Sequence, residues 1–218
     1  MTFDVNYIWR NLPLLLEGLQ LTVLVSLFGL LLAVPLGLVV ALALLRRGRP
    51  ENLAARAYVQ WFRNTPPLIQ IYLVYFGFPM IGLSWNPLAT GVVGLAIYHG
   101  AFLAEVFRAG IAAVSDRQMM AARALGMTDG KAMRRIIIPQ VVRLMLPAIA
   151  NELVLLAKNS SLLSTIAIVE LTMAGKLLAE QSGAVYEVFA AVAALYVILT
   201  VGMGLALRRA EWKLRLEH

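Results

Sequence analysis

Long apolar stretches separated by short polar ones form the main pattern along this chain. Four stretches are almost free of charged residues: 18–45, 64–104, 144–169 and 188–207. A helix that crosses a bilayer needs about 20 consecutive apolar residues. The stretch 64–104 is too long for one crossing, and its segment GFPMIGLSWNP contains glycines and prolines that indicate a turn between two helices. The pattern therefore predicts an all-α membrane protein with about five spans, at about 18–45, 58–80, 87–108, 141–158 and 186–208.

The composition supports a protein of the bilayer. Hydrophobic residues make up 61% of the chain and charged residues 14%, with a mean hydropathy of +0.78, whereas a soluble domain has about 25% charged residues. The net charge of +7 would indicate nucleic-acid binding only if the basic residues formed a patch on a soluble surface, which this pattern does not provide. The chain has no cysteine and only two histidines, so we find no set of metal ligands.

The basic residues lie mainly on one side of a five-span topology. Five fall between residues 46 and 63, seven between 108 and 143, and four between 208 and 215. Because basic loops stay on the cytoplasmic side, the N-terminus is expected outside and the C-terminus inside. We expect one membrane domain over 1–215, and residues 216–218 resemble the remnant of an expression tag.

The segment 118–143, between predicted spans three and four, is basic and rich in small residues: QMMAARALGMTDGKAMRRIIIPQVVR. Its alanines favour a short helix with a small-residue face, and Gly126 permits a sharp turn before a second helix opens around Thr128 and Asp129. Pro139 then closes the segment. This pattern predicts a cytoplasmic docking loop that a partner can approach closely. The alternative is that the alanines and Gly126 only pack the loop.

The motif AARALGM, followed by a basic helix and IIIPQ, resembles the cytoplasmic loop of ABC importer permeases, the membrane subunits gripped by an ATPase. Three further segments resemble the polar amino-acid branch of that family (the histidine, glutamine and glutamate type), in the same order: FRNTPPLIQIYLVYFGFP at 62–79, AFLAEVFRAGIAAV at 101–114 and KNSSLLSTIAIVEL at 158–171. The likeness covers nearly the whole chain. Two positions depart from the family pattern, since Met120 stands in place of a usual glutamate and Arg117 in place of a usual glycine.

This resemblance implies a type I importer membrane domain that moves a polar amino acid into a bacterial cell across the inner membrane. It implies two ATPase subunits, a second permease chain that is identical or related, and an external solute-binding protein that docks on the loops 81–88 and 171–187. No loop of the form GxxxxGKS or GxxxxGKT is present, so ATP and Mg are expected on the partner ATPase, with no cofactor on this chain, which is not itself an enzyme. Coupling to the ATPase is assigned to Gln118, Ala121, Ala122, Leu125 and Gly126.

Ionisable side chains at membrane depth are further candidates, since charge there is costly and usually faces a cavity or another helix. Glu152 lies nine residues after Arg143, about 13 Å along a helix and near the middle of a core about 30 Å thick. It could bind a substrate ammonium or guanidinium group, or it could pair with Lys158 or with a neighbouring helix. Tyr98 and His99 reach a similar depth, where His99 could contact substrate or form an interior hydrogen bond.

The remaining pathway candidates are polar residues near breaks in the apolar pattern: Asn64, Thr65, Gln70, Lys158, Ser160 and Ser161. The first three flank adjacent prolines, whose missing N–H groups suit either a cavity wall or the start of a helix. Glu105 and Arg108 are three residues apart and are predicted to form a structural ion pair. A different class of function also fits the polar face around Glu152 and His99, namely an intramembrane enzyme or an ion channel.

Overall fold

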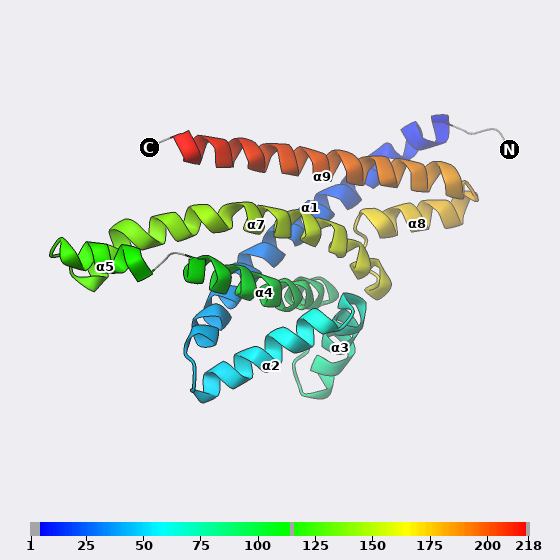
Figure 1. The fold of residues 1–218 in the computed structure, drawn as a ribbon. Coiled ribbons are helices and arrows are strands. Elements are labelled where there is room, and N and C mark those ends of the chain that lie inside the picture. The colour runs from blue at the N-terminus through cyan, green and yellow to red at the C-terminus, as the bar shows by residue number, and fades with distance from the viewer. Residues whose placement is uncertain (1–4, 114–115, 217–218) are drawn as a thin grey trace.

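The computed structural model describes residues 5–113 and 116–216, and every regular element within them is a helix (Figure 1). The first helix, α1 (Val5–Leu45), has 41 residues and is about 60 Å long at 1.5 Å per residue. The helix therefore begins well before residue 18, the predicted start of span one. The apolar pattern stops at Glu17, but that side chain is exposed on the helix surface and does not interrupt the backbone hydrogen bonds.

The predicted span 58–80 is not one continuous helix, because it combines the end of one helix with the whole of another. α2 (Pro50–Asn64) ends before two adjacent prolines, and α3 (Pro67–Met80) begins at the second of them. Thr65 and Pro66 have extended backbone, as expected for residues that precede a proline. The first residue of α3 is a proline because that position needs no N–H group. Figure 1 shows that the two helices run in different directions.

The three remaining long helices contain the other predicted spans, 87–108, 141–158 and 186–208. They are α4 (Pro87–Ala113), α7 (Ile138–Asn159) and α9 (Val185–Leu216). Of the segment that resembles a tag remnant, Leu216 ends α9, and residues 217–218 lie outside the described part of the chain.

Short elements connect these helices: α5 (Asp116–Ala124), α6 (Asp129–Ala132), the π-helical turn η1 (Met133–Ile137), the 3-10 turn η2 (Ser160–Ile166) and α8 (Leu171–Ser182). The first three form most of the predicted docking segment 118–143, whose last residues belong to α7. Most of the segment 171–187, expected as an external loop, is helical, because α8 occupies it. This helix is capped by Glu170 and packs against α1 and α9.

Within the described residues, four helical stretches are long and apolar enough to cross a membrane: Asn6–Leu45, Pro87–Ala113, Asp129–Ile166 and Val185–Arg209. α3 is apolar but has only 14 residues, a length of about 21 Å. Apolar side chains cover much of the outer surface, and Leu31 and Val39 are each 66% exposed. Lipid covers such side chains readily, so the chain is an all-helical protein built to cross a membrane several times.

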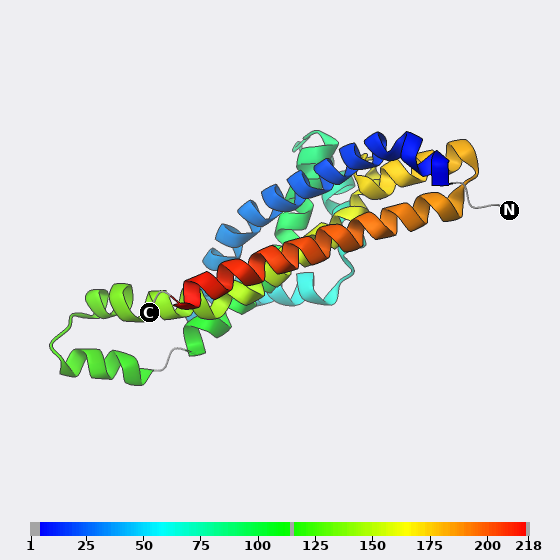
Figure 2. The same cartoon turned by 90° about the horizontal axis from the view of Figure 1, so that it is seen from above.

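α1 is the organising helix of the bundle and contacts α2, α4, α7, α8 and α9. Glycines permit close approach: a Cβ at Gly37 would lie 2.8 Å from Leu103 Cβ on α4, and one at Gly18 would lie 3.0 Å from Leu171 Cα on α8. Small residues serve this purpose between membrane helices. Figure 1 and Figure 2 both place α5 and the end of α9 at one end of the bundle, and the start of α1 at the other. The docking segment therefore shares an end with the C-terminus.

Candidate functional site

The segment between α4 and α7 projects from one end of the bundle as a hairpin of two short helices, α5 and α6 (Figure 2). A tight turn joins them at Gly126, whose φ of +75° is a left-handed conformation that favours glycine. The Gly126 N–H group donates to the Arg123 carbonyl at 2.9 Å, and the Met127 N–H group donates to the Ala122 carbonyl at 3.0 Å. This pair of bonds is the Schellman arrangement that ends a helix. The sharp turn therefore lies where the sequence predicts it.

An ion pair holds the two arms of this hairpin together. Arg123 Nε donates to Asp129 Oδ1 at 2.7 Å, and a terminal nitrogen of Arg123 donates to Oδ2 at 2.8 Å. The hydrogen bond from Arg123 lowers the pKa of the Asp129 carboxyl, and the same bond raises the pKa of Arg123. Both groups therefore stay charged at neutral pH. At the base of the hairpin, Gln118 donates to Gln140 Oε1 at 2.9 Å and connects α5 to α7.

The predicted coupling residues differ in how far a partner can reach them. Leu125 is 82% exposed at the tip of the hairpin, beside Gly126, and Ala121 is exposed on the same helix. Ala122 is only 2% exposed, so it supports the hairpin from inside. Met120, which replaces the glutamate of the family pattern, is 58% exposed. The hairpin thus presents apolar side chains to a partner along with small ones.

A second polar group lies inside the bundle and joins α4 to α7. His99 Nδ1 is 2.8 Å from Glu152 Oε2, and Asn159 Nδ2 is 3.2 Å from His99 Nε2. A carboxylate can only accept, so His99 Nδ1 is the donor in the bond to Glu152. The side chains of His99 and Glu152 are 1% and 8% exposed. Of the interactions considered for Glu152, the structure shows pairing with a neighbouring helix.

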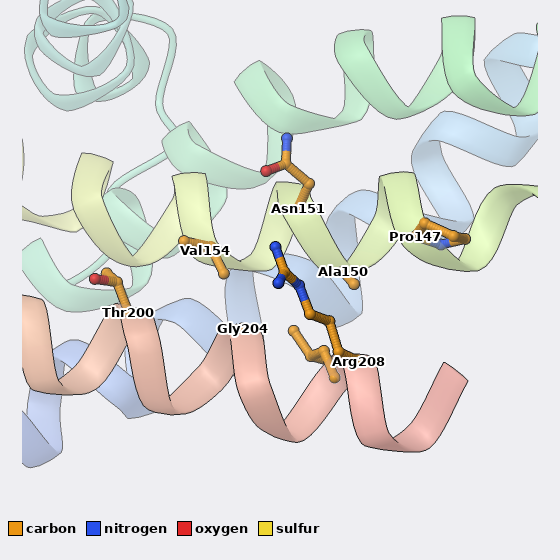
Figure 3. A pocket seen from close by; sticks show the side chains of 8 residues that line it. Pro147, Ala150, Asn151, Val154, Thr200, Gly204 and Arg208 are labelled. Atoms are coloured by element: carbon orange, nitrogen blue, oxygen red, sulfur yellow. The ribbon is translucent and has the colours of Figure 1, made fainter. Parts of the chain in front are cut away.

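Polar side chains line an open groove on the protein surface between α7 and α9. It has a volume of about 350 Å³ and is lined in part by Asn151, Thr200 and Arg208. Figure 3 shows Arg208 reaching from α9 toward α7. A second hollow, of about 340 Å³, shares Thr200 with the first and is lined by Lys158 and Ser161. Lys158 and Ser161, predicted to line a pathway, therefore lie along one open groove, whereas His99 and Glu152 lie inside the bundle.

The polar residues at the break between α2 and α3 bond to backbone carbonyls. Gln70 Nε2 donates to the Phe62 carbonyl at 2.9 Å and to Thr65 Oγ1 at 2.5 Å. The side chains of Asn64 and Thr65 each donate to a carbonyl one turn earlier in α2. These bonds satisfy carbonyl groups at the end of a helix that cannot continue through the prolines. A pathway role for Asn64, Thr65 and Gln70 stays a prediction.

The other candidate residues lie near α4 and at the end of α7. Tyr98 packs edge-on against His99, with ring centroids 5.1 Å apart. Ser160 is buried and donates to a carbonyl of its own helix at 2.9 Å, while both ring nitrogens of His99 are occupied. His99 therefore does not activate Ser160 as a nucleophile. Arg108 donates twice to Glu105 Oε2, at 3.0 and 2.7 Å, so these two residues form an ion pair.

No sequence signal identifies Glu170, because glutamate is not among the favoured residues at a helix N-cap. It is fully buried, and its carboxylate accepts from the N–H groups of Thr172 and Met173, each at 2.9 Å. The hydroxyl groups of Tyr196 on α9 and Thr22 on α1 donate to the same carboxylate, at 2.9 and 3.4 Å. Glu170 therefore connects α8 to α1 and α9.

Comparison with known proteins shows what kind of protein has this architecture. Residues 33–215 match the family described as "Binding-protein-dependent transport system inner membrane component". The chain belongs to this family. The permease is 35% identical to a probable glutamine ABC transporter permease protein of Bacillus subtilis (strain 168), over 97% of this chain and 98% of the relative. It is 38% identical to an octopine transport system permease protein of Rhizobium radiobacter, over 98% of this chain and 91% of the relative.

Solved structures agree with this placement. A crystal structure of an amino acid ABC transporter with histidines matches with a TM-score of 0.90 and 34% identity, over 98% of this chain and 100% of that chain. A methionine ABC transporter in an inward-facing conformation shares the fold, with a TM-score of 0.72 and 22% identity, over 97% of this chain and 99% of that chain. The predicted resemblance to ABC importer permeases is therefore confirmed. The permease is a multi-pass transport subunit, and the intramembrane-enzyme alternative is set aside.

Proposed function

We propose that this permease is the subunit through which a polar amino acid crosses the inner membrane of a bacterium, driven by ATP hydrolysis on a partner ATPase. Relatives named for glutamine and octopine transport, and the amino acid transporter with the same fold, support this substrate class. ATP and Mg bind to the ATPase in this proposal, because the permease sequence has no phosphate-binding loop.

In this proposal the chain crosses the membrane five times, with α2 and α3 together forming the second crossing. The N-terminus lies outside and the C-terminus inside. The clusters of basic residues near Leu45, in the docking segment and in the last turns of α9 support this orientation. The position of α5 and of the end of α9 at the same end of the bundle supports it as well (Figure 1). The solute-binding protein then docks at the opposite end, on the turn 81–86 and on the turn between α8 and α9.

The observation that carries the proposal is the projecting α5–α6 hairpin, with its exposed tip at Leu125 and its ion pair between Arg123 and Asp129. Each of two ATPases receives one such hairpin. When ATP draws the ATPases together, the hairpins move with them. α4 and α7 flank the hairpin and are joined by the bond between His99 and Glu152, so they turn together. This rotation changes the side of the membrane to which the pathway opens.

A second permease chain, identical or related, completes the pathway in this proposal. The groove between α7 and α9 is open and holds Asn151, Lys158 and Arg208. Polar groups at membrane depth are costly against lipid. A second chain that covers the groove removes this cost and encloses the substrate between two subunits.

The test uses the backbone of Gly126. Gly126→Val strains the turn, because a β-branched residue disfavours positive φ, although no atom lies within 4 Å of the added Cβ. Gly126→Asn tolerates that conformation. Gly130→Ala is a matched control in the same hairpin, also with open space around its Cβ but without positive φ.

We expect Gly126→Val to reduce ATP-driven uptake in proteoliposomes about tenfold or more, since the left-handed conformation costs about 1–2 kcal/mol. The assay uses a panel of radiolabelled polar amino acids, and co-purification of the ATPase is measured in parallel. The variant should enter the membrane in normal amounts, while Gly126→Asn and Gly130→Ala should retain uptake. Normal ATP-driven uptake by Gly126→Val would contradict the proposed coupling.

A further inference from the structure

A polar cleft lies where α1 and α4 end side by side, with a volume of about 310 Å³. Its apolar wall comes from the last residues of the two helices, Leu44, Leu45 and Ala112. Its polar wall comes from the turn after α1, from α2 and from α4: Arg47, Arg56, Gln60, Glu105 and Arg108. None of these residues lines the groove between α7 and α9.

The cleft lies at the ends of two helices that are long and apolar enough to cross a membrane. The apolar stretch that includes α1 ends at Leu45, and the one formed by α4 ends at Ala113. Both helices end near the side of the bundle from which α5 projects (Figure 1). A molecule in this cleft would therefore have lipid on one side and water on the other.

The charges of the cleft are not balanced. Glu105 is its only acidic lining residue and is already bound by Arg108, through hydrogen bonds of 3.0 and 2.7 Å. The side chains of Arg47 and Arg56 form no hydrogen bond or ion pair with any other residue that the structure describes. Two guanidinium groups therefore face the cleft without an anion.

Two neighbouring arginines have an acidic partner and provide a comparison. Arg46 and Arg49 lie in the same turn, but both approach Glu51, at 3.6 and 3.9 Å. They do not line the cleft. The unpaired charge thus belongs to the cleft and is not a general property of this basic turn.

We infer that this cleft binds the phosphate group of an anionic phospholipid. Guanidinium groups bind phosphate oxygens through two parallel hydrogen bonds, and basic pockets between membrane helices recognise lipid headgroups. The surface of α1 below the cleft supports lipid over a soluble phosphate, because Val39, Leu42 and Leu45 are 66%, 47% and 39% exposed. The acyl chains lie along these side chains, and the phosphate lies between Arg47 and Arg56.

The experiment measures binding of dioleoyl-phosphatidylglycerol to the delipidated permease, purified with the subunits that accompany it, by native mass spectrometry. The test variant is Arg47→Gln/Arg56→Gln. The control is Arg46→Gln/Arg49→Gln, which removes the same charge from the same turn but leaves the cleft intact. Each basic residue near an anionic lipid contributes about 1 kcal/mol, so the test variant should bind the tightest lipid about 30-fold more weakly. The control should bind like the wild type.

Two further measurements distinguish a lipid site from a site for a soluble anion. Arg47→Lys/Arg56→Lys keeps both charges but loses the paired hydrogen bonds, so it should bind more weakly than the wild type and more tightly than the test variant. Millimolar inorganic phosphate should not displace the lipid. Displacement by inorganic phosphate would overturn the lipid assignment in favour of a soluble anion. Equal weakening in test and control variants would overturn the cleft as a specific site, as would unchanged binding in the test variant. Thermal unfolding without added lipid checks that every variant is folded.

Discussion

Replacing Glu152 separates two roles that its depth in the bundle allows, contact with substrate and support of the helix packing. Its carboxylate accepts from His99 Nδ1 at 2.8 Å and so joins α7 to α4. Glu152→Ala removes the acceptor, whereas Glu152→Gln keeps an acceptor oxygen without the charge. Asn151→Ala is a matched control, because Asn151 is the preceding residue but is exposed in the open groove.

The magnitude follows from the burial of the His99 and Glu152 side chains. Losing one partner of a buried ion pair costs about 3–5 kcal/mol, and an average hydrogen bond between membrane helices contributes only about 0.6 kcal/mol. The His99 side chain is only 1% exposed, so the relevant loss is that of a buried Nδ1–H donor left without an acceptor, about 1–3 kcal/mol. We therefore expect a cost of about 2 kcal/mol for Glu152→Ala and about 1 kcal/mol for Glu152→Gln.

Thermal unfolding of the purified permease in detergent measures this cost. At about 2–4 °C per kcal/mol for a chain of this size, Glu152→Ala should lower Tm by about 4–8 °C and Glu152→Gln by about half as much. Asn151→Ala, as a surface change, should lower Tm by less than about 2 °C. A double-mutant cycle that adds His99→Ala isolates the pair, with an expected coupling energy of about 1–2 kcal/mol.

Two results would refute this reasoning. A coupling energy below about 0.5 kcal/mol would show that the bond between His99 and Glu152 does not support the bundle. An unchanged Tm for Glu152→Gln together with a raised KM for uptake would show that the carboxylate contacts substrate. Asn151→Ala should differ from Glu152→Ala in stability, with reduced uptake at a nearly unchanged Tm.

The remaining predictions concern helix contacts. Gly37→Ala should lower stability by about 1–3 kcal/mol, since the added Cβ would lie 2.8 Å from Leu103 Cβ, while Gly202→Ala, with open space around its Cβ, should leave Tm unchanged or higher. Glu170→Ala should cost about 3 kcal/mol, because it removes the cap of α8 and leaves buried donors unpaired. Tyr196→Phe should cost only about 1 kcal/mol. Thermal unfolding of all four variants tests both statements, and equal Tm values within either pair would contradict them.

Features set by local backbone chemistry could be predicted from the sequence. The turn at Gly126 follows from one residue that tolerates positive φ, and the structure has φ +75° there. The start of α4 at Pro87 follows from the glycines and prolines before it. In both cases the signal lies within a few residues of the feature, so no knowledge of distant packing is needed.

Helix ends predicted from hydropathy are wrong where an apolar stretch and the helical backbone hydrogen bonds end at different residues. The prolines at 66 and 67 interrupt the backbone within an apolar stretch, so the apolar pattern of 58–80 continues while the helix does not. The opposite holds for α1, where Glu17 interrupts the apolar pattern but the helix continues. Apolar character indicates where lipid contacts a chain, whereas N–H groups decide where a helix ends.

Partners across helices could not be predicted, because they depend on how each helix is rotated about its axis. His99 and Glu152 are 53 residues apart, and nothing local links them. The contacts of Glu170 with Thr22 and Tyr196 likewise depend on the packing of three helices. The carboxylates of Glu152 and Glu170 both lie among apolar residues in the sequence. Their depth in the membrane alone is compatible with a substrate site as well as with a structural role.

The rotation of α7 explains why adjacent residues serve different surfaces. Successive residues of a helix point about 100° apart, while residues seven apart share a face. Asn151 and Lys158 therefore line the groove beside α9, and Glu152 turns away toward α4. Val197 and Val201 of α9 are 59% and 54% exposed beside this groove. An open polar groove bordered by apolar side chains is stable in a membrane only when another protein surface covers it, which supports a second permease chain on this side of the molecule.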